Sequence, residues 1–487
     1  MNHKVDKFTE KTIQQLNFLG EKYCDNGKYE EALDFFRTSA KLQYCYNQQY
    51  CDDCIEEYLQ KISLGLNINF SHEKEKNTVL FYDGFGCDLR GLAYIYLKAL
   101  CENGYDIIYV TCEEDCEKQP NITRLLKKDR HKIYRINNIG KVQKIEDLVN
   151  IFKKEKFYIS FFYTTPWDVS AVIAFNELNG KSIRYQINLT DHAFWLGKNT
   201  FDYCLEFRPY GAAVSKYYRN IKESQLIYMP YYPVINNAIE FKGFPFAMQG
   251  KKVVFSGGAL AKTIDENKTY YKLVEYIIQK HEEVVFLYAG DGPREEIQHL
   301  IIKYPERVYL IQERDDLLQV LKRARIYLNT YPISGGLMLQ YAAVAGCVPV
   351  TLRREWDDDA CGILRNEQDL REIFIEFEEI CKEIDKLIED DKYLEDKRAL
   401  LNGQVITEQE FNSRLSLIIE NPSKNIMKDV ESVDTKRFLQ TYKDNITMEN
   451  IAMWMFDKEC NLSLMLQRFP ALAIVRLYNK LIHPNRI

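Results

Sequence analysis

Apolar runs alternate with amphipathic stretches through most of the chain. From residue 78 the segment TVLFYDGFG predicts a buried strand that ends in a glycine turn, and LRGLAYIYLKALCENG predicts the helix that follows it. DIIYVT, KIYRI, FYISFFY and SIRYQINL are further strand candidates, with helical stretches between them. Apolar strands separated by helices are typical of a parallel sheet, so residues 77–235 are predicted to form a first α/β domain.

A second series of the same kind runs over residues 250–420. It contains two glycine-bearing turns, each following an apolar strand, in VVFSGGALAK and IYLNTYPISGGLMLQYAAVAGCVPVT, and the strand and turn VVFLYAGDGPREEI lie between them. The unpaired N–H groups at a helix N-terminus attract a pyrophosphate, and glycine lets the backbone approach it closely. These segments predict a domain that binds a phosphorylated ligand.

Both ends of the chain are helical in pattern. Within residues 1–70 the segment LNFLGEKYCDNGKYEEALDFFRTSAKL has the spacing of one tetratricopeptide repeat, and the polar residues 71–77 form a linker. A single repeat cannot bury its apolar face alone, so we expect it to pack on the next domain or on a partner. Residues 425–487 predict a helical tail that crosses back onto the first domain or mediates dimerisation.

Composition narrows the class of protein. The 487 residues, with 46% hydrophobic and 13% aromatic content, indicate several folded domains rather than a disordered chain. A net charge of −6 gives no general reason to expect nucleic-acid or anionic-membrane binding. No signal-peptide pattern and no membrane-spanning apolar run appear, and 13 cysteines without a disulfide framework indicate reduced thiols, so we expect a cytoplasmic protein.

Two tandem α/β domains with the phosphate turns in the second resemble a GT-B glycosyltransferase, in which two Rossmann-like domains face a cleft. FSGGALAKTIDENK is similar to a segment of O-linked N-acetylglucosamine transferase-like bacterial enzymes whose lysine reaches the donor diphosphate, and Lys262 stands at that position. SGGLMLQYAAVAGCVPVT resembles their nucleotide-sugar segment, in which a turn of small residues caps the pyrophosphate and the next helix presents a ribose ligand. The tetratricopeptide-like unit agrees with this group.

The resemblance implies a nucleotide-sugar donor, most readily a UDP-sugar, and no separate cofactor. The ribose ligand stays open between two neighbours because the segment has an extra residue at Cys347-Val348. The glutamate pair of many retaining enzymes is absent, which favours an inverting reaction. The implied donor-binding residues are Gly257, Gly258, Lys262, Ser334, Gly335, Gly336, and Gln340 or Tyr341.

The stretch INLTDHAFWLGKNTFDYCLEF supplies the candidate catalytic residues. His192 follows a predicted strand, so it is expected at the carboxyl edge of the sheet, and histidine suits a general base toward an acceptor hydroxyl. Asp191 orients it, contacts the acceptor or acts as the base itself. Trp195 and Phe194 offer a stacking face for a sugar or peptide. The alternative is a buried histidine bonded to backbone, with both aromatic residues in the core.

The first strand-to-helix turn, YDGFGCDLRG, supplies Gly84, Gly86 and Arg90 as candidate acceptor or cleft residues, and Arg90 is expected to contact the acceptor or a donor phosphate. Leu89 stands where a dinucleotide-binding site has its third glycine, which disfavours a Rossmann dehydrogenase.

A run of three aspartates, residues 357–359, follows Trp356. We interpret it as a solvated acidic loop beside Arg353-Arg354, and we predict no metal site.

These patterns together predict a metal-independent glycosyltransferase that acts on a protein hydroxyl or a surface glycan. A nucleotide-sugar epimerase of the same architecture and a non-catalytic, glycosyltransferase-like partner subunit are the alternatives. The helical ends are expected to support a homodimer or another protein partner.

Overall fold

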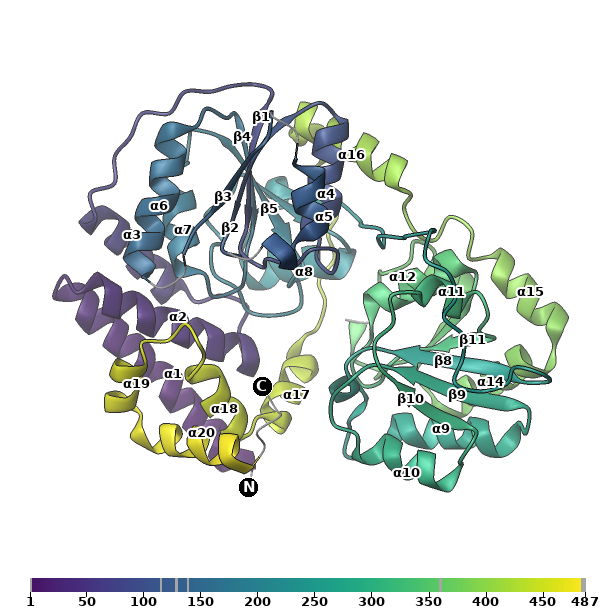
Figure 1. The fold of residues 1–487 in the computed structure, drawn as a ribbon. Coiled ribbons are helices and arrows are strands. Elements are labelled where there is room, and N and C mark those ends of the chain that lie inside the picture. Colours follow the sequence, from purple (N-terminus) through teal and green to yellow (C-terminus); the bar gives the residue numbers. More distant parts are fainter. Residues whose placement is uncertain (1, 114–115, 128–129, 138–139, 359–360, 483–487) are drawn as a thin grey trace. The chain divides into compact units, whose positions relative to one another are not determined.

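The computed structural model describes residues 2–113, 116–127, 130–137, 140–358 and 361–482. The chain divides into two compact units: unit 1 contains residues 1–230 and 411–487, and unit 2 contains residues 231–410 (Figure 1). Each unit is built on one parallel β-sheet with helices packed on it. The predicted fold class, two α/β domains with a helical start, is therefore confirmed.

Unit 1 contains a seven-stranded sheet in the order β3-β2-β1-β4-β5-β6-β7, and all of its strand pairs are parallel. Its central strands are almost wholly buried, which explains their continuous apolar runs. The strands are β1 (Thr78–Asp83), β2 (Asp106–Thr111), β3 (Lys132–Arg135), β4 (Ile159–Tyr163), β5 (Ile183–Asn188), β6 (Tyr203–Glu206) and β7 (Leu226–Tyr228). The helices between them are α4 (Ala93–Glu102), α5 (Pro120–Leu125), α6 (Lys141–Lys154), α7 (Val169–Asn176) and α8 (Pro209–Tyr218).

Helices from both ends of the chain complete unit 1. In the first helical pair, Gly20 permits close packing, because a Cβ there would lie 2.5 Å from the Phe36 ring. The tail returns to these helices: Ile451 and Met465 share a buried cluster with Leu16 and Phe35. The helices are α1 (Asn2–Asp25), α2 (Tyr29–Tyr46), α3 (Asp53–Gly65), α16 (Glu408–Glu420), α17 (Lys436–Asn445), α18 (Met448–Met455), α19 (Leu462–Arg468) and α20 (Pro470–Ile482).

Unit 2 contains a six-stranded parallel sheet in the order β10-β9-β8-β11-β12-β13. Its strands are β8 (Lys252–Gly257), β9 (Val284–Ala289), β10 (Val308–Ile311), β11 (Ile326–Leu328), β12 (Val348–Leu352) and β13 (Ile373–Phe374). Its helices are α9 (Thr269–Lys280), α10 (Glu295–Lys303), α11 (Leu317–Leu321), α12 (Gly336–Ala345), α13 (Glu367–Leu370), α14 (Phe377–Glu389) and α15 (Asp391–Ala399). Within the described ranges, no helix has the length and apolar character needed to cross a lipid bilayer.

The strand order reverses direction once in each sheet. In unit 1 the chain moves outward from β1 to β3 and then returns to place β4 on the other side of β1. In unit 2 the chain moves outward from β8 to β10 and then returns to place β11 on the other side of β8. Ligands of open α/β sheets bind outside the carboxyl ends of the strands at such a switch point, so these two places are where the candidate sites should lie.

A buried carboxyl group joins the N-terminal helices to the α/β part of unit 1. Glu56 on α3 accepts hydrogen bonds from the backbone N–H groups of Gly197 (2.5 Å) and Lys198 (3.3 Å). Burial raises the pKa of Glu56 to about 7, although these two N–H groups act in the opposite direction.

The stability of unit 1 is therefore expected to fall as the pH rises from about 4.5 to about 7. The unfolded chain releases the Glu56 proton near pH 4.5, and the folded chain releases it only near pH 7. The free energy of unfolding is therefore lower by about 3 kcal/mol above this pH range than below it. Glu56→Gln keeps an oxygen acceptor and removes the titration. Urea unfolding at pH 5 and pH 8 should show a smaller pH difference for the variant, and equal differences would contradict the assignment.

Candidate functional site

Three strand ends of unit 2 bring glycine-bearing turns together at its switch point. β8 leads to Gly257 and Gly258, β9 leads to Gly290, and β11 leads into the loop before α12. The Gly258 N–H donates to the Ala289 carbonyl oxygen at 3.0 Å. A Cβ at Gly290 would lie 1.9 Å from the Gly258 carbonyl oxygen, so the two turns pass each other at a distance that only glycine permits.

The loop before α12 is shaped by Asn329, which our sequence analysis did not select. Its side-chain oxygen accepts hydrogen bonds from the N–H groups of Thr330 and Gly335, both at 2.9 Å, and its amide donates to the Thr351 hydroxyl at 3.2 Å. Asn329 is buried, and it is the first residue after β11. A polar residue immediately after a buried strand is the signal that points to it.

The N-terminus of α12 is the candidate anion site of unit 2. Gly335 precedes the helix, and no side chain of the described residues caps its first turn. The unpaired N–H groups and the positive end of the helix dipole favour a negatively charged group there. Gly346 ends the helix in a left-handed conformation, with φ of 71°.

Lys262 and Ser334 lie on neighbouring segments. Lys262 is part of a short 3₁₀ turn after β8, and its carbonyl oxygen accepts a hydrogen bond from the Ile333 N–H at 3.3 Å. The structure therefore brings the predicted lysine segment beside the loop that leads to Ser334, Gly335 and Gly336.

The two candidate ribose ligands are engaged within unit 2. The Gln340 amide donates to the Tyr231 carbonyl oxygen at 3.0 Å, and the Tyr341 hydroxyl donates to the Val234 carbonyl oxygen at 2.8 Å. Burial raises the pKa of the Tyr341 hydroxyl. Both side chains thus hold the 231–234 segment against α12.

An open hollow of ≈ 370 Å³ lies at the carboxyl end of β10, lined by residues 242–245 and 311–315. Arg314 pairs there with Asp316 at 2.6 Å. The hollow lies at the edge of the sheet where its strands end.

The acidic run after Trp356 is more buried than expected. Asp357 is only 5% exposed and pairs with Arg354 at 2.5 Å, while Asp358 lies 3.3 Å from Arg353. The interpretation as a solvated loop is therefore wrong for Asp357, because its carboxylate is buried and paired with Arg354. Asp359 lies outside the described residues.

In unit 1, Asp83 shapes the turn that carries Gly84 and Gly86. One carboxylate oxygen accepts hydrogen bonds from the N–H groups of Phe85 (3.1 Å) and Gly86 (3.0 Å), and the other accepts the Tyr109 hydroxyl at 2.7 Å. Burial raises the pKa of Asp83 to about 6 despite these donors. Like Asn329, Asp83 lies at the end of a buried strand, and our sequence analysis did not select it.

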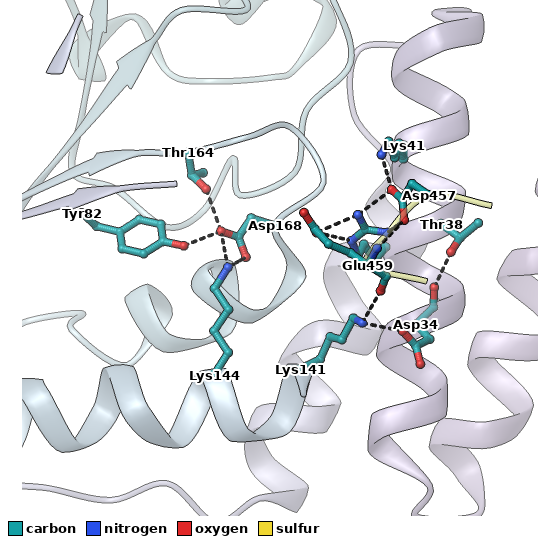
Figure 2. Close-up of polar contacts among 11 residues, drawn as sticks. Asp34, Thr38, Lys41, Tyr82, Lys141, Lys144, Thr164, Asp168, Asp457 and Glu459 are labelled. Atoms are coloured by element: carbon teal, nitrogen blue, oxygen red, sulfur yellow. Dashed lines mark hydrogen bonds and ion pairs between the residues drawn. The ribbon is translucent and has the colours of Figure 1, made fainter. Parts of the chain in front are cut away.

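A pocket of ≈ 200 Å³ lies beside this turn. Figure 2 shows ion pairs that involve its lining residues. Lys144 lies 2.9 Å from Asp168, which also accepts hydrogen bonds from the hydroxyls of Tyr82 and Thr164. Burial alone lowers the pKa of Lys144, but the Asp168 carboxylate more than offsets this effect and raises it. Asp168 also caps the N-terminus of α7 by accepting the Ala171 N–H.

The other ion pairs join α2, α6 and the tail. The Arg37 guanidinium lies 2.7 Å from both Asp457 and Glu459, and Lys141 lies 2.8 Å from Asp34. The pocket offers both donors and acceptors, with more cations than carboxylates. Its charged lining residues are Arg37, Lys41, Lys141, Lys144, Lys458, Glu113, Asp168 and Glu459. Arg90 is exposed on the loop that follows Gly86.

His192 follows β5 and is held by a buried carboxylate. Its Nδ1 lies 3.2 Å from Asp191 Oδ1, and one third of its side chain is exposed. Asp191 is wholly buried and pairs with Arg208 at 2.6 Å. Burial alone raises the pKa of Asp191, but the Arg208 guanidinium lowers it well below its usual range. Asp191 has no exposed surface, and its carboxylate lies against His192 and Arg208.

Arg219 holds the loop that carries His192 through hydrogen bonds to its backbone. This wholly buried guanidinium donates to the carbonyl oxygens of Asp191 (3.0 Å) and Ala193 (2.6 Å). It lies 4.7 Å from the centre of the Trp195 ring. Trp195 and Phe194 are buried in the core, so neither ring offers the stacking face that the sequence suggested.

Comparison with solved structures identifies the fold. No protein-family model matches the sequence, and no curated protein matches it. A mutant of the O-GlcNAc transferase from Thermobaculum terrenum aligns with a TM-score of 0.52 and 14% identity over 88% of this chain and 85% of that one. A putative UDP-N-acetylglucosamine 2-epimerase from Listeria monocytogenes aligns with a TM-score of 0.51 and 11% identity over 74% of this chain and 100% of that one. A glycosyltransferase from Rickettsia africae aligns with a TM-score of 0.51 and 12% identity over 72% of this chain and 100% of that one.

The fold is GT-B. At these identities the likeness concerns the fold alone. The two parallel sheets and their strand orders are the features that this chain shares with that fold.

Gly290→Ala is expected to destabilise unit 2 by about 1–3 kcal/mol, because the new methyl group would overlap the Gly258 carbonyl oxygen. Gly335→Ala is the matched control: its Cβ would lie 3.3 Å from the nearest atom, on Asn329, in a backbone conformation with φ of −104°. Urea unfolding followed by circular dichroism should show the larger loss for Gly290→Ala. Equal losses would contradict the proposed close passage of the turns.

Proposed function

We propose that this protein is a glycosyltransferase that moves a sugar from a nucleotide-sugar donor, most readily a UDP-sugar, to a hydroxyl group of a protein or a surface glycan. The observation that carries the proposal is the meeting of two glycine turns and an uncapped helix N-terminus at the switch point of unit 2. The names of the matched structures, which include glycosyltransferases, support the same class.

The donor diphosphate would bind at the N-terminus of α12, with Lys262 as its cation. Negative charge builds up on the diphosphate as the bond to the sugar breaks, so groups that stabilise it favour the transition state. One charge-assisted hydrogen bond contributes about 1.5–3 kcal/mol, and a helix terminus contributes up to ~2 kcal/mol. The turns at Gly257, Gly258 and Gly335 would let the backbone reach the phosphate oxygens. These groups stabilise charge without a metal ion.

His192 would act as the general base that accepts the proton of the acceptor hydroxyl. Its Nδ1 lies 3.2 Å from Asp191 Oδ1, and the ionised Asp191 would stabilise the imidazolium that forms. Direct attack of the activated hydroxyl on the sugar gives an inverting reaction. The pocket beside Gly84 and Gly86, with both donors and acceptors of hydrogen bonds, would suit a polar acceptor group.

A nucleotide-sugar epimerase is the second candidate, because a protein named as a putative UDP-N-acetylglucosamine 2-epimerase shares the fold over its whole length. An epimerase converts the nucleotide sugar without an acceptor, whereas a transferase releases nucleotide only as the acceptor is glycosylated. A non-catalytic partner subunit would do neither.

The donor site is tested by thermal shift with UDP, GDP, CDP and their sugars. A nucleotide at one hundred times its dissociation constant should add about 2.7 kcal/mol of stability to the wild type. Lys262→Ala should lose most of this gain, while Lys272→Ala, an exposed lysine on α9, should keep it. If no nucleotide stabilises the wild type, the non-catalytic alternative is favoured.

The proposed base is tested by His192→Ala in a transfer assay with EDTA present, because we propose no metal dependence. The variant should fold normally, since its side chain is partly exposed, and its kcat should fall by about 10²–10⁴-fold. Donor binding in the thermal-shift assay should stay unchanged. Transfer close to the wild-type rate would remove His192 from the mechanism, and loss of transfer in EDTA would show a metal requirement.

A further inference from the structure

The Asn329 side chain holds both ends of the loop that leads into α12. Its Oδ1 accepts hydrogen bonds from the N–H groups of Thr330 and Gly335, each at 2.9 Å, and from the Tyr327 hydroxyl at 3.2 Å. Its amide nitrogen donates to the hydroxyl of Thr351 on the neighbouring strand β12 at 3.2 Å. Asn329 is only 1% exposed, so these contacts fix the loop from inside the core of unit 2.

Two further hydrogen bonds connect this loop to the segment that carries Lys262. The Thr330 hydroxyl donates to the Ile333 carbonyl oxygen at 2.6 Å, and the Ile333 N–H donates to the Lys262 carbonyl oxygen at 3.3 Å. Thr330 is itself held by Asn329 through its N–H. One buried side chain therefore holds the start of α12 directly and the Lys262 segment through Thr330 and Ile333.

Asn329 also decides which N–H groups at the start of α12 stay available. It takes the Gly335 N–H, whereas the next three N–H groups have no hydrogen-bond acceptor among the residues that the structure describes. Those three belong to Gly336, Leu337 and Met338. The first N–H groups of a helix find no partner within it, so three neighbouring donors are left for an anionic ligand.

We propose that Asn329 is a positioning residue for the donor, which fixes the start of α12 and the Lys262 segment at the spacing that a diphosphate requires. This role rests on the proposed donor site and names the group that preorganises it. Donors that are already in place cost no rearrangement when charge builds up on the diphosphate. The acceptor oxygen of Asn329 makes the contacts to the loop, so aspartate at this position should replace it and alanine should not.

The clamp is tested in the ligand-free protein by hydrogen exchange of the backbone amides, read by mass spectrometry. In Asn329→Ala, peptides that cover residues 260–263 and 330–338 should exchange about tenfold faster than in the wild type, because both segments lose their common anchor. Asn329→Asp keeps the acceptor and should exchange as the wild type does.

His281→Ala is the matched control for a lost buried polar contact. The His281 ring lies 2.8 Å from Asp385 and is buried, but the residue precedes β9, at the opposite edge of the same sheet. This variant should lower the melting temperature of unit 2 and leave the exchange of both peptides unchanged.

The consequence for the ligand is tested by calorimetry with UDP, GDP and CDP and with the matching nucleosides. For the diphosphate that binds the wild type, Asn329→Ala should raise the Kd about tenfold, which corresponds to about one charge-assisted hydrogen bond. The Kd of its nucleoside, measured by competition, should stay unchanged because a nucleoside has no phosphate. Asn329→Asp should restore most of the affinity, and His281→Ala should bind both ligands as the wild type does.

Three results would overturn this role, and they can be told apart. Wild-type exchange of both peptides in Asn329→Ala would remove the clamp and leave the donor site itself in place. An equal loss of affinity for the diphosphate and the nucleoside would show a general loosening of unit 2 instead of positioning. If no diphosphate binds the wild type, the proposed donor site fails and the role of Asn329 fails with it.

Discussion

The parallel direction of the strands determines where every candidate site residue lies. Because all strands of a sheet end on the same edge, the residues that follow β1, β4 and β5 collect on one edge of unit 1, and those that follow β8, β9 and β11 collect on one edge of unit 2. Gly258 and Gly290 are far apart in sequence, yet their backbones touch because the strands before them are neighbours. Gly84 and Asp168 meet at the edge of unit 1 for the same reason.

Patterns of local sequence predicted the fold and the glycine turns because both depend on local chemistry. A strand that is buried on both faces needs a continuous apolar run, and a tight turn beside another backbone needs glycine. Asn329 and Asp83 stand in equally local positions, directly after and at the end of buried strands, so a search of strand ends for polar residues would have found them.

The sequence could not predict which polar groups meet across the chain. Nothing near residue 340 shows that Gln340 and Tyr341 hold the 231–234 segment, and nothing near Asp191 shows that Arg208 neutralises it. Trp195 illustrates the same limit: nothing near it in the sequence shows that the Arg219 guanidinium lies against its ring in the core. Such contacts depend on the packing of whole elements, which a single sequence without its fold does not specify.

The split of unit 1 between the two ends of the chain has a consequence for biosynthesis. Arg37 is almost wholly buried, and its partners Asp457 and Glu459 are translated more than four hundred residues later. A buried cation without its carboxylate is strongly unfavourable, so a nascent chain that lacks the tail cannot complete this part of unit 1. Unit 2, which is continuous in sequence, emerges from the ribosome before unit 1 is finished. A prematurely terminated polypeptide would therefore leave the apolar residues of the first helices without the tail that covers them.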